Sequence, residues 1–127
     1  MVCAHLTVAC LTVTAGPLFL WKYLKDTSHQ AWTLNSLARV YRFSGQPEQA
    51  KRPFCLAVEL AENEGRQDNV SEYLRNLSGA QRLSGALRAS QASVCRALQI
   101  SREREDHSAE ARSLQTLGPS LAARGIE

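Results

Sequence analysis

The chain has 127 residues, of which 44% are hydrophobic and 6% aromatic, and its formal net charge is +3. This length suits one small domain whose core is built mainly from Leu, Ala and Val. Gly and Pro are few and placed singly and no run of charge is long. These features exclude a low-complexity linker and a nucleic-acid-binding tail.

The first element is an almost uncharged segment, residues 2–20. Its length is compatible with a membrane span, and the small residues Val13 and Ala15 are placed like those before a signal-peptide cleavage site. Lys and Arg are absent from the first 21 residues, and a Gly-Pro step at 16–17 interrupts the segment, which argues against both interpretations.

A third interpretation makes residues 18–25 the end of a helix that precedes a set of repeats. A shift of forty residues places Leu20 on Leu60 and Ile100, and the same shift applied twice places Asp26 on Asp106. We therefore expect residues 1–30 to form an apolar N-terminal segment and a degenerate capping helix. The membrane anchor and the cleaved signal peptide stay open as alternatives.

Residues 31–70 are the best-preserved copy of an internal repeat of forty residues. Its first half places apolar residues at steps of three and four, which predicts one buried face of a helix. Glycine at position 45 and proline at position 47 then favour a helix end followed by a new helix. The stripes predicted to be buried are Leu34, Leu37, Ala38 and Tyr41 in the first helix, and Ala50, Phe54, Ala57, Val58 and Ala61 in the second.

The same plan returns in residues 71–110 and begins again in residues 111–127, where only a first helix is present, roughly Ser108 to Arg124. An internal period between twenty and fifty residues is typical of repeat architectures. The sequence therefore predicts an all-α fold, a solenoid of αα-hairpins with two full repeats and one partial repeat. Each hairpin needs neighbours to bury its apolar face.

The four cysteines do not indicate a disulfide framework. Cys55 and Cys95 occupy the same place in successive repeats, next to Phe54 and Val94, so we expect them to be reduced and buried as small hydrophobes. In the N-terminal segment, Cys3, His5 and Cys10 lack the further ligands that a structural zinc site requires. No metal and no other cofactor is expected.

The order Leu34, Leu37-Ala38, Tyr41, Gly45, Ala50, Phe54, Ala57 resembles the tetratricopeptide repeat. The usual unit has 34 residues, whereas this one has forty. Long units of this kind are similar to those of kinesin light chains and of the sensor arms of bacterial signalling NTPases. The resemblance covers residues 18–127 and implies a right-handed superhelix whose first helices line a concave side that holds peptides.

Residues facing outward from the first helices are the predicted partner-binding set. We expect this set to form a basic concave groove: Asn35, Arg39, Arg42, Phe43, Arg75, Asn76 and Arg82. Arginine forks bind carboxylates through two parallel hydrogen bonds. The resemblance implies that the asparagines pair with a ligand's backbone. The expected partner is a protein or peptide with an acidic segment or a C-terminal carboxylate, although a merely solvated helix face fits the arginines nearly as well.

No catalytic signature is present. The chain lacks a phosphate-binding loop, a Gly-x-Ser-x-Gly elbow and a His-Glu-x-x-His pair. At 106–108, Asp-His-Ser favours a helix N-cap. We expect a non-enzymatic, cytoplasmic protein–protein interaction module that does not bind nucleic acid. The alternatives are a truncated regulatory arm of a larger signalling protein, such as a signalling NTPase, and an adaptor tethered to a membrane through residues 2–20.

Overall fold

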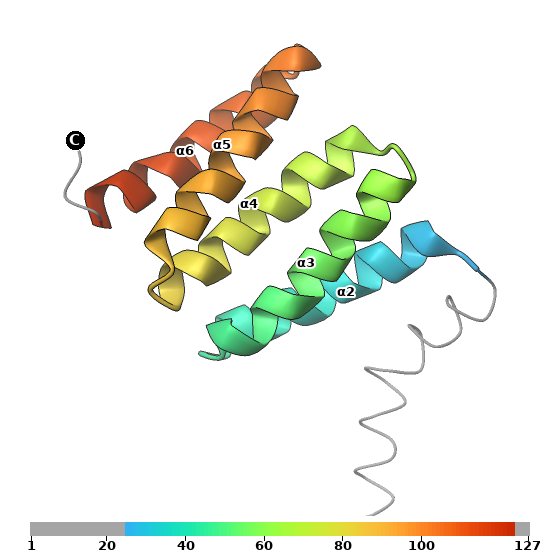
Figure 1. The fold of residues 1–127 in the computed structure, drawn as a ribbon, viewed down its shortest axis with the longest axis horizontal. Coiled ribbons are helices and arrows are strands. Elements are labelled where there is room, and N and C mark those ends of the chain that lie inside the picture. The colour runs from blue at the N-terminus through green and yellow to red at the C-terminus, as the bar shows by residue number, and fades with distance from the viewer. Residues whose placement is uncertain (1–24, 124–127) are drawn as a thin grey trace, which may run out of the picture.

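The computed structural model describes residues 25–123, and the side chains of residues 25–118. Within this range the chain contains only α-helices, as the sequence predicts. The expectations for residues 1–24 lie outside the described part. The helices follow one another as antiparallel neighbours (Figure 1), in the order α2 (Thr27–Phe43), α3 (Pro47–Asn63), α4 (Gln67–Leu83), α5 (Leu87–Glu103) and α6 (His107–Ala123).

The helices have a regular length and spacing. Each has 17 residues, and because they begin at positions 27, 47, 67, 87 and 107, consecutive starts are 20 residues apart. The forty-residue repeat of the sequence therefore corresponds to two helices and their two turns. The hairpins span residues 27–63 and 67–103, so each begins four residues before the window read from the sequence, at 27 and not 31.

A left-handed backbone residue stands two positions before every described helix. Gly45, Gly65 and Gly85 fill three of these positions with φ of 80°, 71° and 87°, as expected for glycine at a helix end. Lys25 and Glu105 fill the other two with φ of 57° and 54°. A residue with a Cβ atom is strained by about 1–2 kcal/mol in this conformation. The turn at Glu105 is therefore strained where its three counterparts are not.

Replacing Glu105 by glycine is expected to raise the free energy of unfolding by about 1 kcal/mol, because the left-handed strain disappears. Urea denaturation followed by circular dichroism measures the change. The reciprocal variant, Gly45→Ala, is the control and is expected to lower stability by a similar amount. A Glu105→Gly variant less stable than the parent would contradict this account of the turn.

Two aspartates cap helix N-termini at matching positions in the repeat. Asp26 Oδ1 accepts a hydrogen bond of 3.1 Å from the backbone N–H of His29, and Asp106 Oδ1 accepts one of 3.0 Å from that of Ala109. The bond from the His29 backbone also lowers the pKa of Asp26. The predicted N-cap at 106–108 is thus confirmed.

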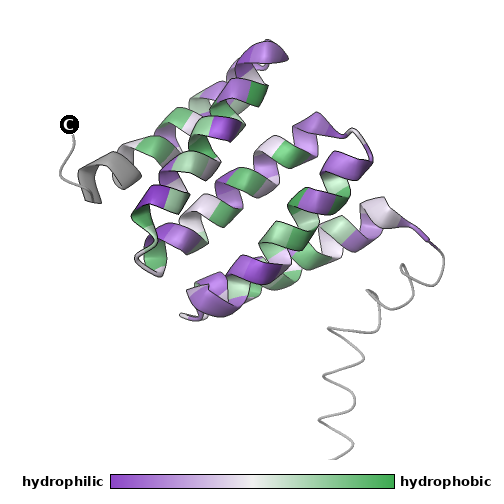
Figure 2. Cartoon of the chain, in the orientation of Figure 1, coloured by the Kyte–Doolittle hydropathy of each residue, from purple (hydrophilic) through white to green (hydrophobic). Residues whose placement is uncertain are grey.

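The buried stripes agree with the prediction for the second helix of the first hairpin, where all five residues are buried. Figure 2 shows hydrophobic and hydrophilic residues alternating along the helices, as expected where one face is buried. Phe54 is fully buried and forms one cluster with Ala38, Ala50, Leu77 and Ala80. A second cluster joins both hairpins: Ala31, Leu34, Ala57, Val58, Ala61, Val70, Tyr73, Leu74, Ala97 and Ile100.

The expectation that Cys55 and Cys95 are buried is wrong, since both are exposed free thiols. The buried positions are taken by the preceding residues, Phe54 and Val94. One step along an α-helix rotates the side chain by about 100°, which turns each cysteine away from the core. Desolvation of the partly covered thiol raises the pKa of Cys55, and the nearby Glu59 carboxylate raises it further, which disfavours the thiolate form.

Serine replaces alanine at the helix crossings of the second hairpin. A shift of forty residues places Ser78 on Ala38 and Ser90 on Ala50, and all four residues are fully buried. Ser78 Oγ lies 2.8 Å from Ser90 Oγ and 2.9 Å from the Ser90 carbonyl oxygen. Both hairpins therefore use small residues for close helix approach, and the second adds hydrogen bonds between α4 and α5.

The packing order places alternate helices in contact. Every helix packs against its neighbours in the chain, and α4 also contacts α2 and α6. Helices α2, α4 and α6 therefore share one side of the fold, with α4 in the middle (Figure 1). Among the described residues, no helix is both long and apolar enough to cross a membrane.

Candidate functional site

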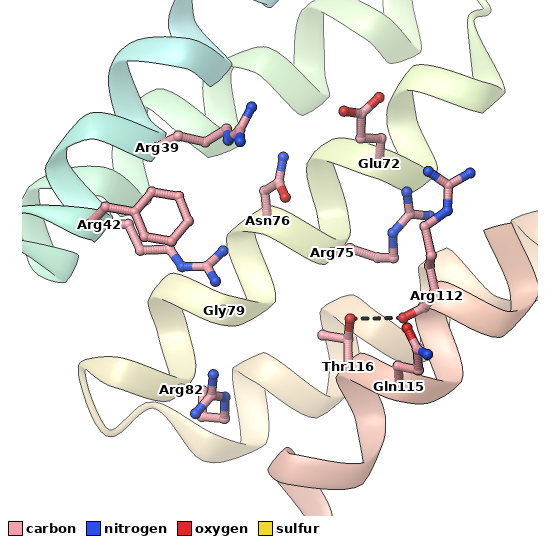
Figure 3. Close-up of a pocket in the computed structure, with 11 residues that line it drawn as sticks. Arg39, Arg42, Glu72, Arg75, Asn76, Gly79, Arg82, Arg112, Gln115 and Thr116 are labelled. Atoms are coloured by element: carbon pink, nitrogen blue, oxygen red, sulfur yellow. Dashed lines mark hydrogen bonds between the residues drawn. The ribbon is translucent and has the colours of Figure 1, made fainter.

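One cavity of about 490 Å³ lies on the side of the fold formed by α2, α4 and α6 (Figure 3). All of its lining residues come from these three helices. We call it the arginine groove, and it is lined by Arg39, Arg42, Phe43, Glu72, Arg75, Asn76, Gly79, Arg82, Arg112, Gln115 and Thr116. The site is thus built by residues that are up to 77 positions apart, from Arg39 to Thr116.

Six of the seven residues predicted from the sequence line this groove, and Asn35 does not. Asn35 is only 3% exposed, and its Oδ1 accepts a hydrogen bond of 2.9 Å from Asn76 Nδ2. The expectation that Asn35 faces outward is therefore wrong. A buried amide needs a hydrogen-bond partner, and Asn76 is the partner of Asn35. The bond between the two asparagines therefore links α2 to α4.

Five lining residues were absent from the predicted partner-binding set, namely Glu72, Gly79, Arg112, Gln115 and Thr116. The internal repeat relates two of them to residues of α4. Thr116 is the forty-residue equivalent of Asn76, and Arg112 is the equivalent of Glu72. The correspondence is incomplete, because Trp32, the equivalent of Glu72, and Asn35, the equivalent of Arg75, do not line the groove.

The groove is strongly basic. It contains five arginines and a single acidic residue, Glu72, so these six side chains have a formal charge of +4. Within the described residues, none of the five guanidinium groups forms an ion pair with a carboxylate. Two have neutral partners: Arg75 Nη1 donates to Ser71 Oγ at 3.1 Å, and Arg112 Nη2 donates to Ser108 Oγ at 3.2 Å.

Arg42 is held against the backbone of α4. A Cβ atom added to Gly79 would lie 2.7 Å from Arg42 Nη1 and 2.8 Å from Arg42 Cζ, so glycine at this position provides the space for the guanidinium. The Arg42 guanidinium also lies 4.8 Å from the centre of the Phe43 ring, a cation–π contact. Burial lowers the pKa of Arg42, and repulsion from Arg82 and Arg39 lowers it further.

The pKa of Arg75 is subject to opposing effects. Burial lowers its pKa and Arg112 adds to that effect, whereas the carboxylates of Glu72 and Asp106 oppose it. In Figure 3, Glu72 and Arg112 lie on the same side of the groove as Arg75, away from Arg42. Of the two half-buried guanidinium groups, Arg75 therefore has carboxylates nearby that favour its charge, whereas the charges that act on Arg42 are those of other arginines.

The chemistry available in the groove is anion binding. Guanidinium groups donate paired hydrogen bonds to carboxylates and phosphates, and the groove offers five of them. Among the described residues, no cluster of three or more His, Cys, Asp or Glu side chains is arranged to hold a metal ion. Outside the groove, His107 lies 3.8 Å from Glu110, which also accepts a hydrogen bond of 3.0 Å from Arg102 Nε.

Trp32 is not part of the groove. This residue is 61% exposed on α2, beside Ser28 and His29.

Neither a scan against models of known protein families nor a search of curated proteins finds a match to this chain.

Proposed function

We propose that this chain is a right-handed tetratricopeptide-like solenoid that acts, without enzymatic activity, as a protein–protein interaction module. Its arginine groove holds an extended acidic peptide or the C-terminal carboxylate of a partner. The observation that carries the proposal is the convergence of five arginines from α2, α4 and α6 on one cavity with a single acidic residue. The equal helices and the packing of each helix on its neighbours support the solenoid.

Burial distinguishes this proposal from a merely solvated arginine face. Arg42 and Arg75 are half-buried, and neither forms an ion pair with a carboxylate within the described residues. A buried charge without a counter-charge costs free energy. An anionic ligand offsets that cost, whereas guanidinium groups on a solvated face extend into water and need no such ligand.

Selection of random peptides on the intact chain tests the proposal. The selected peptides are expected to be enriched in Asp and Glu or to end in a free carboxylate. Their affinity is expected to fall as salt rises from about 0.05 to 0.5 M, because screening weakens contacts with the groove's charges. Fluorescence anisotropy at several salt concentrations measures this. Selected peptides that lack acidic groups and bind independently of salt would contradict the proposed function.

A further inference from the structure

The positive charge of the arginine groove is divided unevenly. Arg39, Arg42 and Arg82, which we call the arginine triad, line the same groove, with Arg42 lying between the other two in Figure 3. Both Arg39 and Arg82 repel the charge of Arg42. Arg75 and Arg112, which we call the arginine pair, line the groove together with its one acidic residue, Glu72, and the charges of both Arg112 and Glu72 act on Arg75. The triad therefore has a formal charge of +3, while the pair together with Glu72 has a formal charge of +1.

The triad also contains a buried hydrogen-bond donor that has no partner among the described residues. Arg42 Nε is buried and has no hydrogen-bond partner among the described residues. Leaving a buried donor unpaired costs free energy, more so for a charged group. Because Gly79 has no side chain, the guanidinium of Arg42 lies against α4 inside the groove, where a Cβ atom would collide with it.

We propose that the arginine triad binds a phosphate monoester on a phosphorylated partner segment, and that the arginine pair binds a carboxylate of the same segment. This inference deepens the proposed function and rests on it. The division follows the local charges: the subsite with three arginines and no acid takes the dianion, and the subsite of net charge +1 takes the monoanion.

A phosphate monoester fits the triad better than a carboxylate does. It has a charge of about −1.5 to −2 at pH 7 and three strong acceptor oxygens arranged tetrahedrally, so it can meet guanidinium groups that approach from two helices. A carboxylate has one charge and two coplanar oxygens.

A nucleic-acid backbone presents one charge per phosphate at regular spacing, which matches the uneven groove poorly. A bilayer surface is too flat to enter the cavity.

Three peptide pools with identical randomised flanks, differing only in a central phosphoserine, glutamate or serine, test this inference on the full chain. The phosphoserine pool is expected to bind at least about tenfold more tightly than the glutamate pool, because the second charge and third oxygen engage the triad. Inorganic phosphate is expected to compete with the phosphoserine pool at lower concentration than acetate does.

Two variants separate the triad from the pair. Gly79→Ala displaces the Arg42 guanidinium and is expected to reduce the preference for phosphoserine over glutamate to within about threefold, since this preference depends on charge-assisted bonds. Gly118→Ala is the matched control: it is also a helical glycine, but nothing lies within 4 Å of its added Cβ. Arg112→Ala is expected to weaken the phosphoserine and glutamate pools alike and to leave their ratio unchanged.

The outcomes distinguish this inference from the proposed function. Equal binding of the phosphoserine and glutamate pools would overturn the inference and leave an acidic-peptide module standing. Failure of all three pools to bind would overturn both. Tighter binding to vesicles containing phosphoinositide, or to a single-stranded RNA oligonucleotide, than to the phosphoserine pool would also overturn the inference. Loss of the phosphoserine preference in Gly79→Ala but not in Gly118→Ala would support it.

Discussion

Replacing Phe54 by alanine is expected to lower the free energy of unfolding by about 3–5 kcal/mol. The ring is fully buried in a cluster whose other members are Ala38, Ala50, Leu77 and Ala80. Three of these four are alanines, which cannot rotate into the space that the ring leaves. The cavity therefore persists, and its cost adds to the lost transfer free energy of the side chain. Urea denaturation followed by circular dichroism measures the effect.

The matched control is Phe43→Ala, which removes the same side chain from a position that is 69% exposed on α2. We expect it to change the free energy of unfolding by no more than about 0.5 kcal/mol, because little apolar surface is uncovered. A domain with a total stability of about 5–15 kcal/mol would be severely weakened by the first change and little affected by the second. Equal losses in the two variants would contradict the core described here.

Reversing the charge of Arg39, Arg75 and Arg82 together is expected to weaken binding of a selected acidic peptide by at least about a hundredfold. A hydrogen bond to a charged group contributes about 1.5–3 kcal/mol, and about 2.7 kcal/mol corresponds to a hundredfold change in affinity. Three glutamates also repel the ligand, so the effect exceeds the loss of the arginines alone. Fluorescence anisotropy with the labelled peptide measures the affinity.

The control for this variant changes the net charge equally. Arg52, Arg88 and Arg104 are exposed, lie outside the arginine groove and are replaced by glutamate in the same way. We expect affinity to change by less than about threefold at physiological salt, where charges more than about 8 Å from the ligand are largely screened. If both triple variants lost affinity equally, binding would depend on the net charge of the chain and not on the groove.

Local sequence patterns determined the helices of this protein and much of their buried surface. Apolar residues at steps of three and four define a helix face whatever lies opposite, which is why the stripe from Ala50 to Ala61 was predicted correctly. The helix ends at glycine could also be predicted, because the conformational freedom of glycine is a local property. Six of the seven predicted groove residues could be named because they lie on the outward faces of the first helices of the repeats.

Only the tertiary structure decided which polar residues form contacts between helices and which line the arginine groove. Asn35 is buried because Asn76, 41 residues later, reaches it across the contact between α2 and α4. The space beside Gly79 is occupied by the guanidinium of Arg42, which belongs to another helix. The uneven charge of the groove arises in the same way, since Glu72 and Arg112 come from different helices. Periodicity specifies which face of a helix is buried, but the side chain it meets depends on how neighbouring helices pack.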